Sequence, residues 1–159
     1  MIQIDGSTLT IAQVIAIARS EENVGIAPHA IEAMQRSRAV VERLATGEAA
    51  VYAVNTGVGL LADKRVSAND LEKLQRNVVR SHAAGVDEPM GIAETRAMML
   101  IRANVLAKGF SGIRPVVAER LCDLLNRGVT PVVPGRGSVG ASGDLAPLAH
   151  MALVVIGEG

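Results

Sequence analysis

Helix start and stop signals recur along most of this chain, and they leave little room for an extended sheet. Residues 28–47 show them most clearly, because Pro28 suits a first helical turn and Gly47 suits the end of a helix. Further helices are predicted over residues 9–20, 67–85, 93–109, 114–128 and 145–157. The pattern therefore indicates a mainly α fold with a few short extended pieces.

Local residues predict where three of these helices begin. Thr8 or Thr10 is expected to cap the first helix, Ser67 the third and Asp144 the last, because their side-chain oxygens can accept backbone N–H groups. Pro147 falls in the first turn of the last helix, where proline is tolerated. The boundaries of these helices are thus set by local chemistry.

Short extended segments are predicted between the helices. Residues 1–5 alternate in polarity, residues 50–55 are rich in β-prone types, and residues 129–135 contain two prolines. No internal repeat, low-complexity tract or linker interrupts the sequence. Residues 1–159 are therefore expected to form a single domain.

Composition restricts both the core and the partners. Apolar residues make up 49% of the chain, but it has one Tyr, one Phe and no Trp, so its core must be largely aliphatic. Sixteen basic and sixteen acidic residues cancel, which leaves no electrostatic footprint for nucleic acid or an anionic membrane. The longest apolar stretch, residues 145–157, is shorter than the roughly 20 residues that cross a bilayer.

Cysteine and histidine usage predicts no metal site. Cys122 is the only cysteine, which excludes an intrachain disulfide and a cysteine zinc cluster, and it is expected to be a small core residue. His29 and His150 show no ligand spacing and are expected to be a surface and a helix residue. The first ten residues lack the features of a signal peptide, so a reducing, cytoplasmic setting is expected.

A glycine-rich loop raises the question of nucleotide binding. Gly135, Gly137 and Gly140 match G-x-G-x-x-G, after an extended segment and before a helix. However, Pro131 and Pro134 do not suit a central parallel strand, and no second strand follows. There is also no Gly-Lys-Ser/Thr sequence, so nucleotide binding is not expected.

Ala141, Ser142 and Gly143 offer a different chemistry. If the Gly143 nitrogen attacks the Ala141 carbonyl carbon, a five-membered ring closes around Ser142 and water leaves. Loss of the Ser142 hydroxyl as a second water then gives a conjugated, electrophilic methylidene group. This reaction needs a small residue at 141 and no Cβ at 143, within a strained turn. A bare Ala-Ser-Gly tripeptide is more often an ordinary turn before a helix cap.

Four ordered motifs favour the reactive interpretation. Residues 137–150, GSVGASGDLAPLAH, closely resemble the signature of the aromatic amino acid ammonia-lyases, whose Ala-Ser-Gly becomes a 4-methylidene-imidazol-5-one (MIO) group. Residues 52–59, YAVNTGVG, resemble the family's Tyr-Gly-x-Asn-Thr-Gly-Phe-Gly loop. Residues 74–85 resemble its substrate-pocket helix, and residues 102–114 resemble its Arg-x-Asn-x-Leu-x-x-Gly-x-Ser-Gly segment.

The resemblance implies a fold and a cofactor. The fold is the N-terminal, MIO-bearing domain of the helical ammonia-lyase/aspartase-like proteins, whose C-terminal helical bundle would lie beyond residue 159. Ala141, Ser142 and Gly143 would form MIO autocatalytically, and neither a metal nor a nucleotide is implied. Two departures lie beside the expected site, where Ala53 replaces the family's glycine and Val58 its phenylalanine.

The resemblance also implies roles for Tyr52, Asn55 and Asp144. Tyr52 matches the catalytic base that removes the weakly acidic β-hydrogen of the substrate. Asn55 is expected to fix the loop around Tyr52 or to reach the site. Asp144 is expected to help position the cyclising backbone, a role compatible with capping the last helix.

Ser81 and His82 match the positions that meet the substrate's side chain. By itself, His82 would more often be a core histidine, because it shares a helical stripe with Leu71, Leu74 and Val78. Ser-His resembles the family members that act on histidine, whereas tyrosine-preferring members tend to have His-Leu and phenylalanine-preferring members an apolar pair. Because an imidazole can hydrogen-bond another imidazole, histidine is the expected substrate.

The implied reaction is elimination of ammonia from L-histidine to give urocanate, in a homotetramer whose sites draw on more than one subunit. Residues 1–159 alone are expected to be an inactive fragment of such an enzyme. Two alternatives stay open. One is a tyrosine or phenylalanine ammonia-lyase or aminomutase, and the other is a non-catalytic interaction domain with the same fold.

Overall fold

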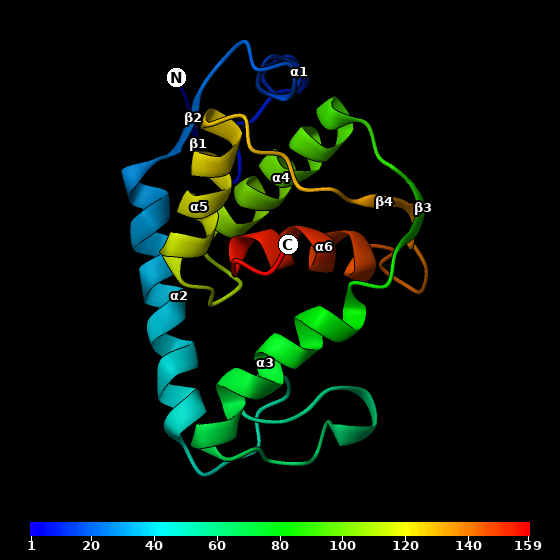
Figure 1. Cartoon of the computed structure of the whole chain (residues 1–159). Helices are drawn as coiled ribbons and strands as arrows, with labels where there is room; N and C mark the ends of the chain where they lie inside the picture. Colours follow the sequence, from blue (N-terminus) through cyan, green and yellow to red (C-terminus); the bar gives the residue numbers. More distant parts are fainter.

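Six α-helices dominate the structure, a computed structural model that describes residues 1–159 in full (Figure 1). The helices are α1 (Ile11–Ala18), α2 (Pro28–Thr46), α3 (Ala68–His82), α4 (Ile92–Ala107), α5 (Pro115–Asn126) and α6 (Leu145–Val155). A 3-10 turn, η1 (Gly59–Leu61), lies between α2 and α3. The mainly α prediction is confirmed, and no helix has the length and apolarity needed to cross a membrane.

The strands form two separate pairs. β1 (Ile2–Ile4) runs parallel to β2 (Val24–Ile26), with Ile2 opposite Val24. β3 (Val86–Pro89) pairs antiparallel with β4 (Pro134–Arg136). The sequence predicted β1 and an extended segment around β4, but it gave no separate signal for β2 or β3.

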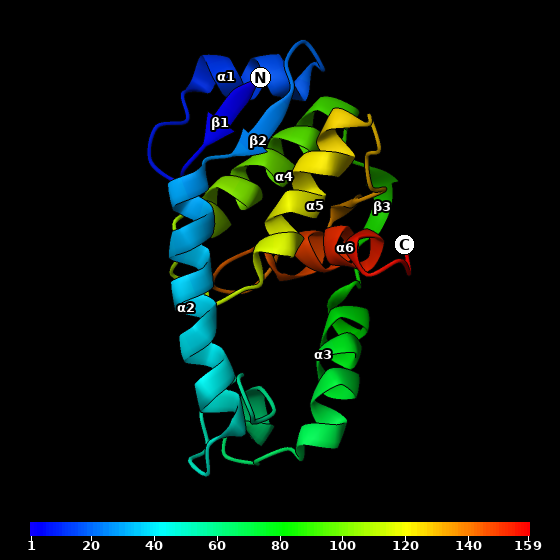
Figure 2. The same cartoon turned by 90° about the vertical axis from the view of Figure 1, so that its left-hand side faces the viewer.

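One aliphatic core joins β1, β2 and five of the helices. It includes Ile4, Ile17, Met34, Met99 and Leu121, all at most 1% exposed. In Figures 1 and 2, α2 descends from this core along one side, the chain turns at the lower end, and α3 returns upward. α3 contributes no buried residue, so it lies outside the core and packs against α6.

Cys122 lies in the core, as predicted. Burial raises the pKa of its thiol to about 12, and the carboxylates of Asp123 and Glu119 add to the shift. The thiol is therefore protonated at neutral pH and is a poor nucleophile.

Several local predictions about helix ends are confirmed. Pro28 occupies the first turn of α2, and Gly47 is the residue at its carboxyl end. Thr10, rather than Thr8, caps α1, where its side chain and that of Gln13 form a reciprocal capping box. Pro147 lies in the first turn of α6.

One local prediction is wrong, and the two helix caps Ser67 and Asp144 are predicted at the correct positions but without the expected side-chain hydrogen bonds. Residues 50–55 form turns rather than a strand, because Val54 and Asn55 both donate backbone hydrogen bonds to the Val51 carbonyl. Ser67 precedes α3, but its hydroxyl donates to the Asp70 carboxylate at 2.7 Å instead of accepting a backbone N–H. Asp144 precedes α6 with a helix-like backbone (φ −108°, ψ −7°), and its side chain makes no capping hydrogen bond.

Candidate active site

The glycine loop connects β4 to α6 and contains the Ala-Ser-Gly sequence. Residues 140–142 form a turn, and the flanking Gly140 and Gly143 have φ values of +81° and +72°. A Cβ added to Gly143 would lie 2.9 Å from the Ser138 hydroxyl oxygen. Glycine is therefore favoured at 143 by its positive φ, and a side chain there would also displace the Ser138 hydroxyl.

These three residues meet the needs of the MIO group. Ala141 is small, Ser142 carries the hydroxyl to be lost, and Gly143 has no Cβ that would hinder its own backbone nitrogen. Ser142 is exposed, and its hydroxyl oxygen accepts the Asp144 N–H at 3.4 Å. The turn thus fits a group made from residues 141–143.

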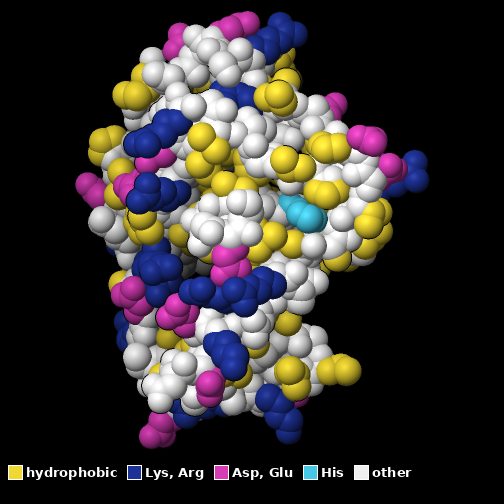
Figure 3. Space-filling model, in the orientation of Figure 1, with side chains coloured by type: hydrophobic (Ala, Val, Ile, Leu, Met, Phe, Trp, Pro, Cys, Tyr) yellow, Lys and Arg dark blue, Asp and Glu magenta, His cyan; other side chains and the backbone are white.

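Two pockets flank the loop. The larger pocket, of about 870 Å³, includes Ser138, Gly143 and Asp144 in its wall, together with residues from α4 and α6. The smaller pocket, of about 460 Å³, places Gly137 and Leu145 opposite the end of α3. Residues 137–145 therefore form a partition between the two pockets. Figure 3 shows hydrophobic side chains gathered on this side of the molecule, around α6 and the β3–β4 pair.

Ser81 and His82, at the carboxyl end of α3, line the smaller pocket. The Nδ1 atom of His82 lies 2.8 Å from the Val78 carbonyl oxygen and 3.1 Å from the Ser81 hydroxyl. Because a carbonyl oxygen only accepts hydrogen bonds, Nδ1 carries the proton in this arrangement. The Nε2 lone pair of His82 is thereby left as an acceptor.

Tyr52 lies on an exposed turn, and its side chain is 63% exposed. The buried Asn55 holds this turn. Its side-chain oxygen accepts the Val51 N–H at 2.7 Å, and its side-chain nitrogen donates to the Ala49 carbonyl at 2.9 Å. Asn55 therefore acts here on the backbone that carries Tyr52.

Ala53 has a left-handed backbone conformation, with φ +58°. The family pattern has glycine at this position, which needs no Cβ to be accommodated at positive φ. Thr56 stabilises the turn, since its hydroxyl oxygen accepts the Ala53 N–H at 3.1 Å. This departure from the pattern therefore costs strain in the backbone next to Tyr52.

Tyr52 and Ser142 lie at opposite ends of α3 within one chain. The Tyr52 turn is tied to the start of α3, because Val66 donates to the Asn55 carbonyl at 2.9 Å. The glycine loop is packed against the other end, where a Cβ at Gly137 would lie 3.0 Å from the Cα of Gly85. A helix of 15 residues separates them, which corresponds to about 20 Å. Ser81 and His82 thus lie near the glycine loop, and Tyr52 does not.

Asp144 and His150 were difficult to assign from the sequence. The exposed Asp144 lines the larger pocket beside Gly143. His150, predicted only as a helix residue, accepts the Gly85 N–H through Nε2 at 3.0 Å. No sequence signal connects residues 65 positions apart, so only the fold reveals this contact.

The family model described as aromatic amino acid lyase matches residues 9–159. This chain belongs to that family.

Curated relatives include the histidine ammonia-lyases of Anaeromyxobacter dehalogenans, 60% identical over 98% of this chain, and of Myxococcus xanthus, 54% identical over 99%. The chain spans only 31% of the length of each. Among solved structures, tyrosine aminomutase from Streptomyces globisporus superposes with a TM-score of 0.89 at 39% identity, over 99% of this chain and 30% of the other. Histidine ammonia-lyase from Trypanosoma cruzi gives 0.86 at 34% identity, over the same shares. The helical ammonia-lyase fold is thus confirmed.

Proposed function

We propose that residues 1–159 form the N-terminal domain of a cytoplasmic histidine ammonia-lyase, which converts L-histidine to urocanate and ammonia. The observation that carries this proposal is that Val139 and Leu145, on either side of the Ala-Ser-Gly turn, line the same pocket as Ser81 and His82. The identity of 54–60% to curated histidine ammonia-lyases supports it. The remaining two-thirds of such an enzyme would be a C-terminal helical bundle.

Each of the candidate site residues has its own role in the proposed reaction. His82 accepts the imidazole N–H of the substrate through Nε2, while its Nδ1–H is held by the Val78 carbonyl. Ser81 adds a hydroxyl to the same pocket wall. The MIO group made from residues 141–143 supplies the electrophile of the reaction. The Tyr52 oxygen removes the β-hydrogen of the substrate as a proton.

Tyr52 reaches the site from another subunit in this proposal. The separation of about 20 Å along α3 keeps it from the Ser142 turn of its own chain. A homo-oligomer, a tetramer by family resemblance, brings the two together. The reaction requires neither a metal ion nor a nucleotide.

A tyrosine or phenylalanine ammonia-lyase or aminomutase is the second candidate, and the likeness to tyrosine aminomutase favours it. The polar Ser81–His82 pair favours histidine over phenylalanine, because a phenyl side chain would leave His82 Nε2 unpaired. A non-catalytic interaction domain is the third. Comparing histidine, tyrosine and phenylalanine as substrates of the complete polypeptide distinguishes the three, and histidine is expected to react fastest.

The central test is Ser142→Ala in the complete polypeptide, with Ser138→Ala as the control on the same loop. Intact mass should show the unsubstituted protein and Ser138→Ala two waters lighter than their sequences require. Ser142→Ala has no hydroxyl to lose as the second water, so it should lose at most the one water of ring closure and fold normally, but lose at least about a thousandfold in ammonia release, as expected when an electrophilic catalyst is removed. Near-normal turnover by Ser142→Ala would exclude the MIO mechanism.

A further inference from the structure

α3 is held in position by its contacts with α6 and the residues that follow α6. No residue of α3 is buried. Outside its own helix and the adjoining turns, the side-chain hydrogen bonds of α3 join Arg76 and Arg80 to Glu158, just after α6. α6 begins at Leu145, directly after the Ala-Ser-Gly-Asp sequence. One short helix therefore connects the reactive turn to the helix that carries Ser81 and His82.

The first connection is His150, in the middle of α6. Its Nε2 accepts the N–H of Gly85, three residues after His82, at 3.0 Å. The contact is close, because a Cβ on Gly85 would lie 3.1 Å from that nitrogen and 3.1 Å from the Pro134 side chain. Since a backbone N–H only donates, the neutral ring of His150 carries its proton on Nδ1.

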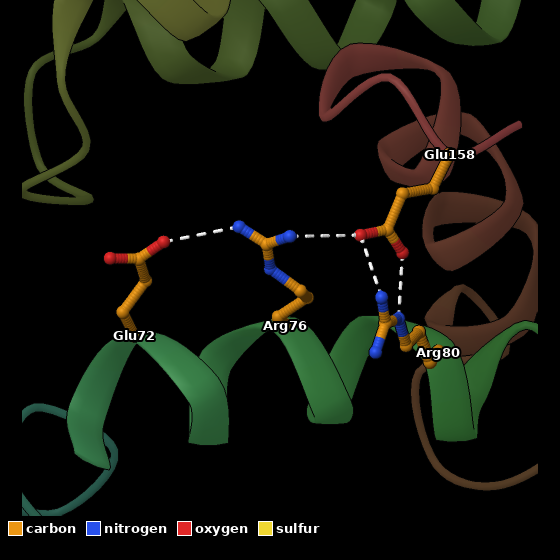
Figure 4. A network of polar contacts seen from close by, with 4 residues as sticks. All are labelled: Glu72, Arg76, Arg80 and Glu158. Atoms are coloured by element: carbon orange, nitrogen blue, oxygen red, sulfur yellow. Dashed lines mark hydrogen bonds and ion pairs between the residues drawn. The ribbon is translucent and has the colours of Figure 1, made fainter.

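The second connection is Glu158, just after α6 (Figure 4). Its carboxylate accepts from Arg80 Nε at 2.7 Å and Nη2 at 2.9 Å, and from Arg76 Nη1 at 3.2 Å. These bonds lower the pKa of Glu158 and raise that of Arg80. A two-pronged arginine–carboxylate pair fixes orientation as well as distance.

We propose that His150 is a positioning residue for the substrate pocket. His150 holds Gly85 on α6, and Glu158 holds Arg80. Together these contacts set the distance between Ser81–His82 and the loop residues on the opposite wall of the smaller pocket. The role of His150 in shaping a substrate pocket rests on the proposed function. The role of His150 in holding Gly85 does not, because this contact is independent of the reaction.

The structural test is hydrogen exchange at residues 83–86 of the complete polypeptide. His150→Leu removes the acceptor and should speed exchange of the Gly85 amide at least about tenfold, as expected for a lost hydrogen bond. His150→Gln retains an acceptor and should preserve most of the protection. His29→Leu is the control at an exposed histidine. Equal protection in the unsubstituted protein and His150→Leu would overturn the proposal.

The functional test separates positioning from folding. His150→Leu should raise KM for histidine about tenfold, because the donor it leaves unpaired loosens the pocket wall. It should lower kcat less, and it should reduce the preference for histidine over phenylalanine. His150→Gln should restore KM to within about threefold of the unsubstituted value. Intact mass should show MIO formed in all three proteins.

Two results would count against the positioning role. An unchanged KM and preference in His150→Leu would overturn it, and so would equal losses in His150→Gln and His150→Leu. Failure of the proposed function looks different, because the unsubstituted protein would then release no ammonia from histidine. In that case the exchange measurement still tests whether His150 holds Gly85.

Discussion

Arg96 carries a positive charge into the core, where it is 2% exposed and has no carboxylate beside it. Its guanidinium donates to the carbonyls of Ala18 at 3.0 Å, Leu125 at 3.0 Å and Ile17 at 2.8 Å. These carbonyls end α1 and α5, where helix dipoles favour a cation. Burial lowers the pKa of Arg96, but an arginine stays charged in proteins.

Arg96→Met should therefore lower the free energy of unfolding by about 3 kcal/mol, since three charge-assisted hydrogen bonds are lost. Arg96→Lys keeps the charge but lacks the planar fork, and an intermediate loss is expected. Urea denaturation of both variants measures these values. A methionine variant as stable as the unsubstituted chain would show that the bonds contribute nothing net.

At the level of elements, the connection between α4 and α5 explains one of the family-like motifs. Gly109 and Gly112 in residues 102–114 have φ values of +74° and +62°. Ala33 and Val41 lie on α2. A Cβ on Gly109 would lie 2.7 Å from the Cβ of Ala33, and a Cβ on Gly112 would collide with the Val41 side chain. Gly112 N–H also donates to the Ser37 hydroxyl at 2.7 Å. The glycines of this motif thus let the connection pack against α2.

Gly112→Ala should cost about 2–4 kcal/mol in the free energy of unfolding, from left-handed strain and overpacking together. Gly128→Ala is the matched control, because Gly128 has φ +70° and nothing within 4 Å of an added Cβ. It should show the strain alone, about 1 kcal/mol. Adding Val41→Ala to Gly112→Ala should recover part of the loss. Equal losses at 112 and 128 would refute the packing explanation.

At the scale of the whole molecule, the distance between Tyr52 and Ser142 keeps one chain from bringing both residues into the same site. The smaller pocket is lined by Ser81, His82 and loop residues such as Val139, but not by Tyr52. Apolar side chains such as Leu145 and Ile156 at the ends of α6 are also exposed, at 58% and 44%. Exposed apolar surface favours association, and association is what the proposed site requires.

Subunit complementation tests whether the proposed site takes Tyr52 and Ser142 from different chains. In the complete polypeptide, Tyr52→Phe and Ser142→Ala should each be nearly inactive, but mixed subunits should regain measurable ammonia release, because a site can take Tyr52 from one chain and Ser142 from another. Mixing Tyr52→Phe with the double variant is the control and should regain none. Residues 1–159 alone should release no ammonia. No recovery despite verified subunit exchange would place both groups in one chain.

The sequence by itself determined the helices, most of their ends and the chemistry available at residues 141–143. These features are local: Pro28, Thr10 and Gly47 act on the turn in which they lie. Local propensity failed at residues 50–55, where the buried hydrogen bonds of Asn55 override β-prone side chains. It also failed to show β2 and β3, which are only three and four residues long.

Only the tertiary structure decided which of the candidate site residues lie together. It brings Ser81 and His82 to the glycine loop, keeps Tyr52 at the far end of α3, and joins Gly85 to His150 across 65 positions. The physical reason is that spacing along the chain specifies which face of a helix a residue occupies, but not which helix packs on that face. That choice belongs to the packing of α3 on α6.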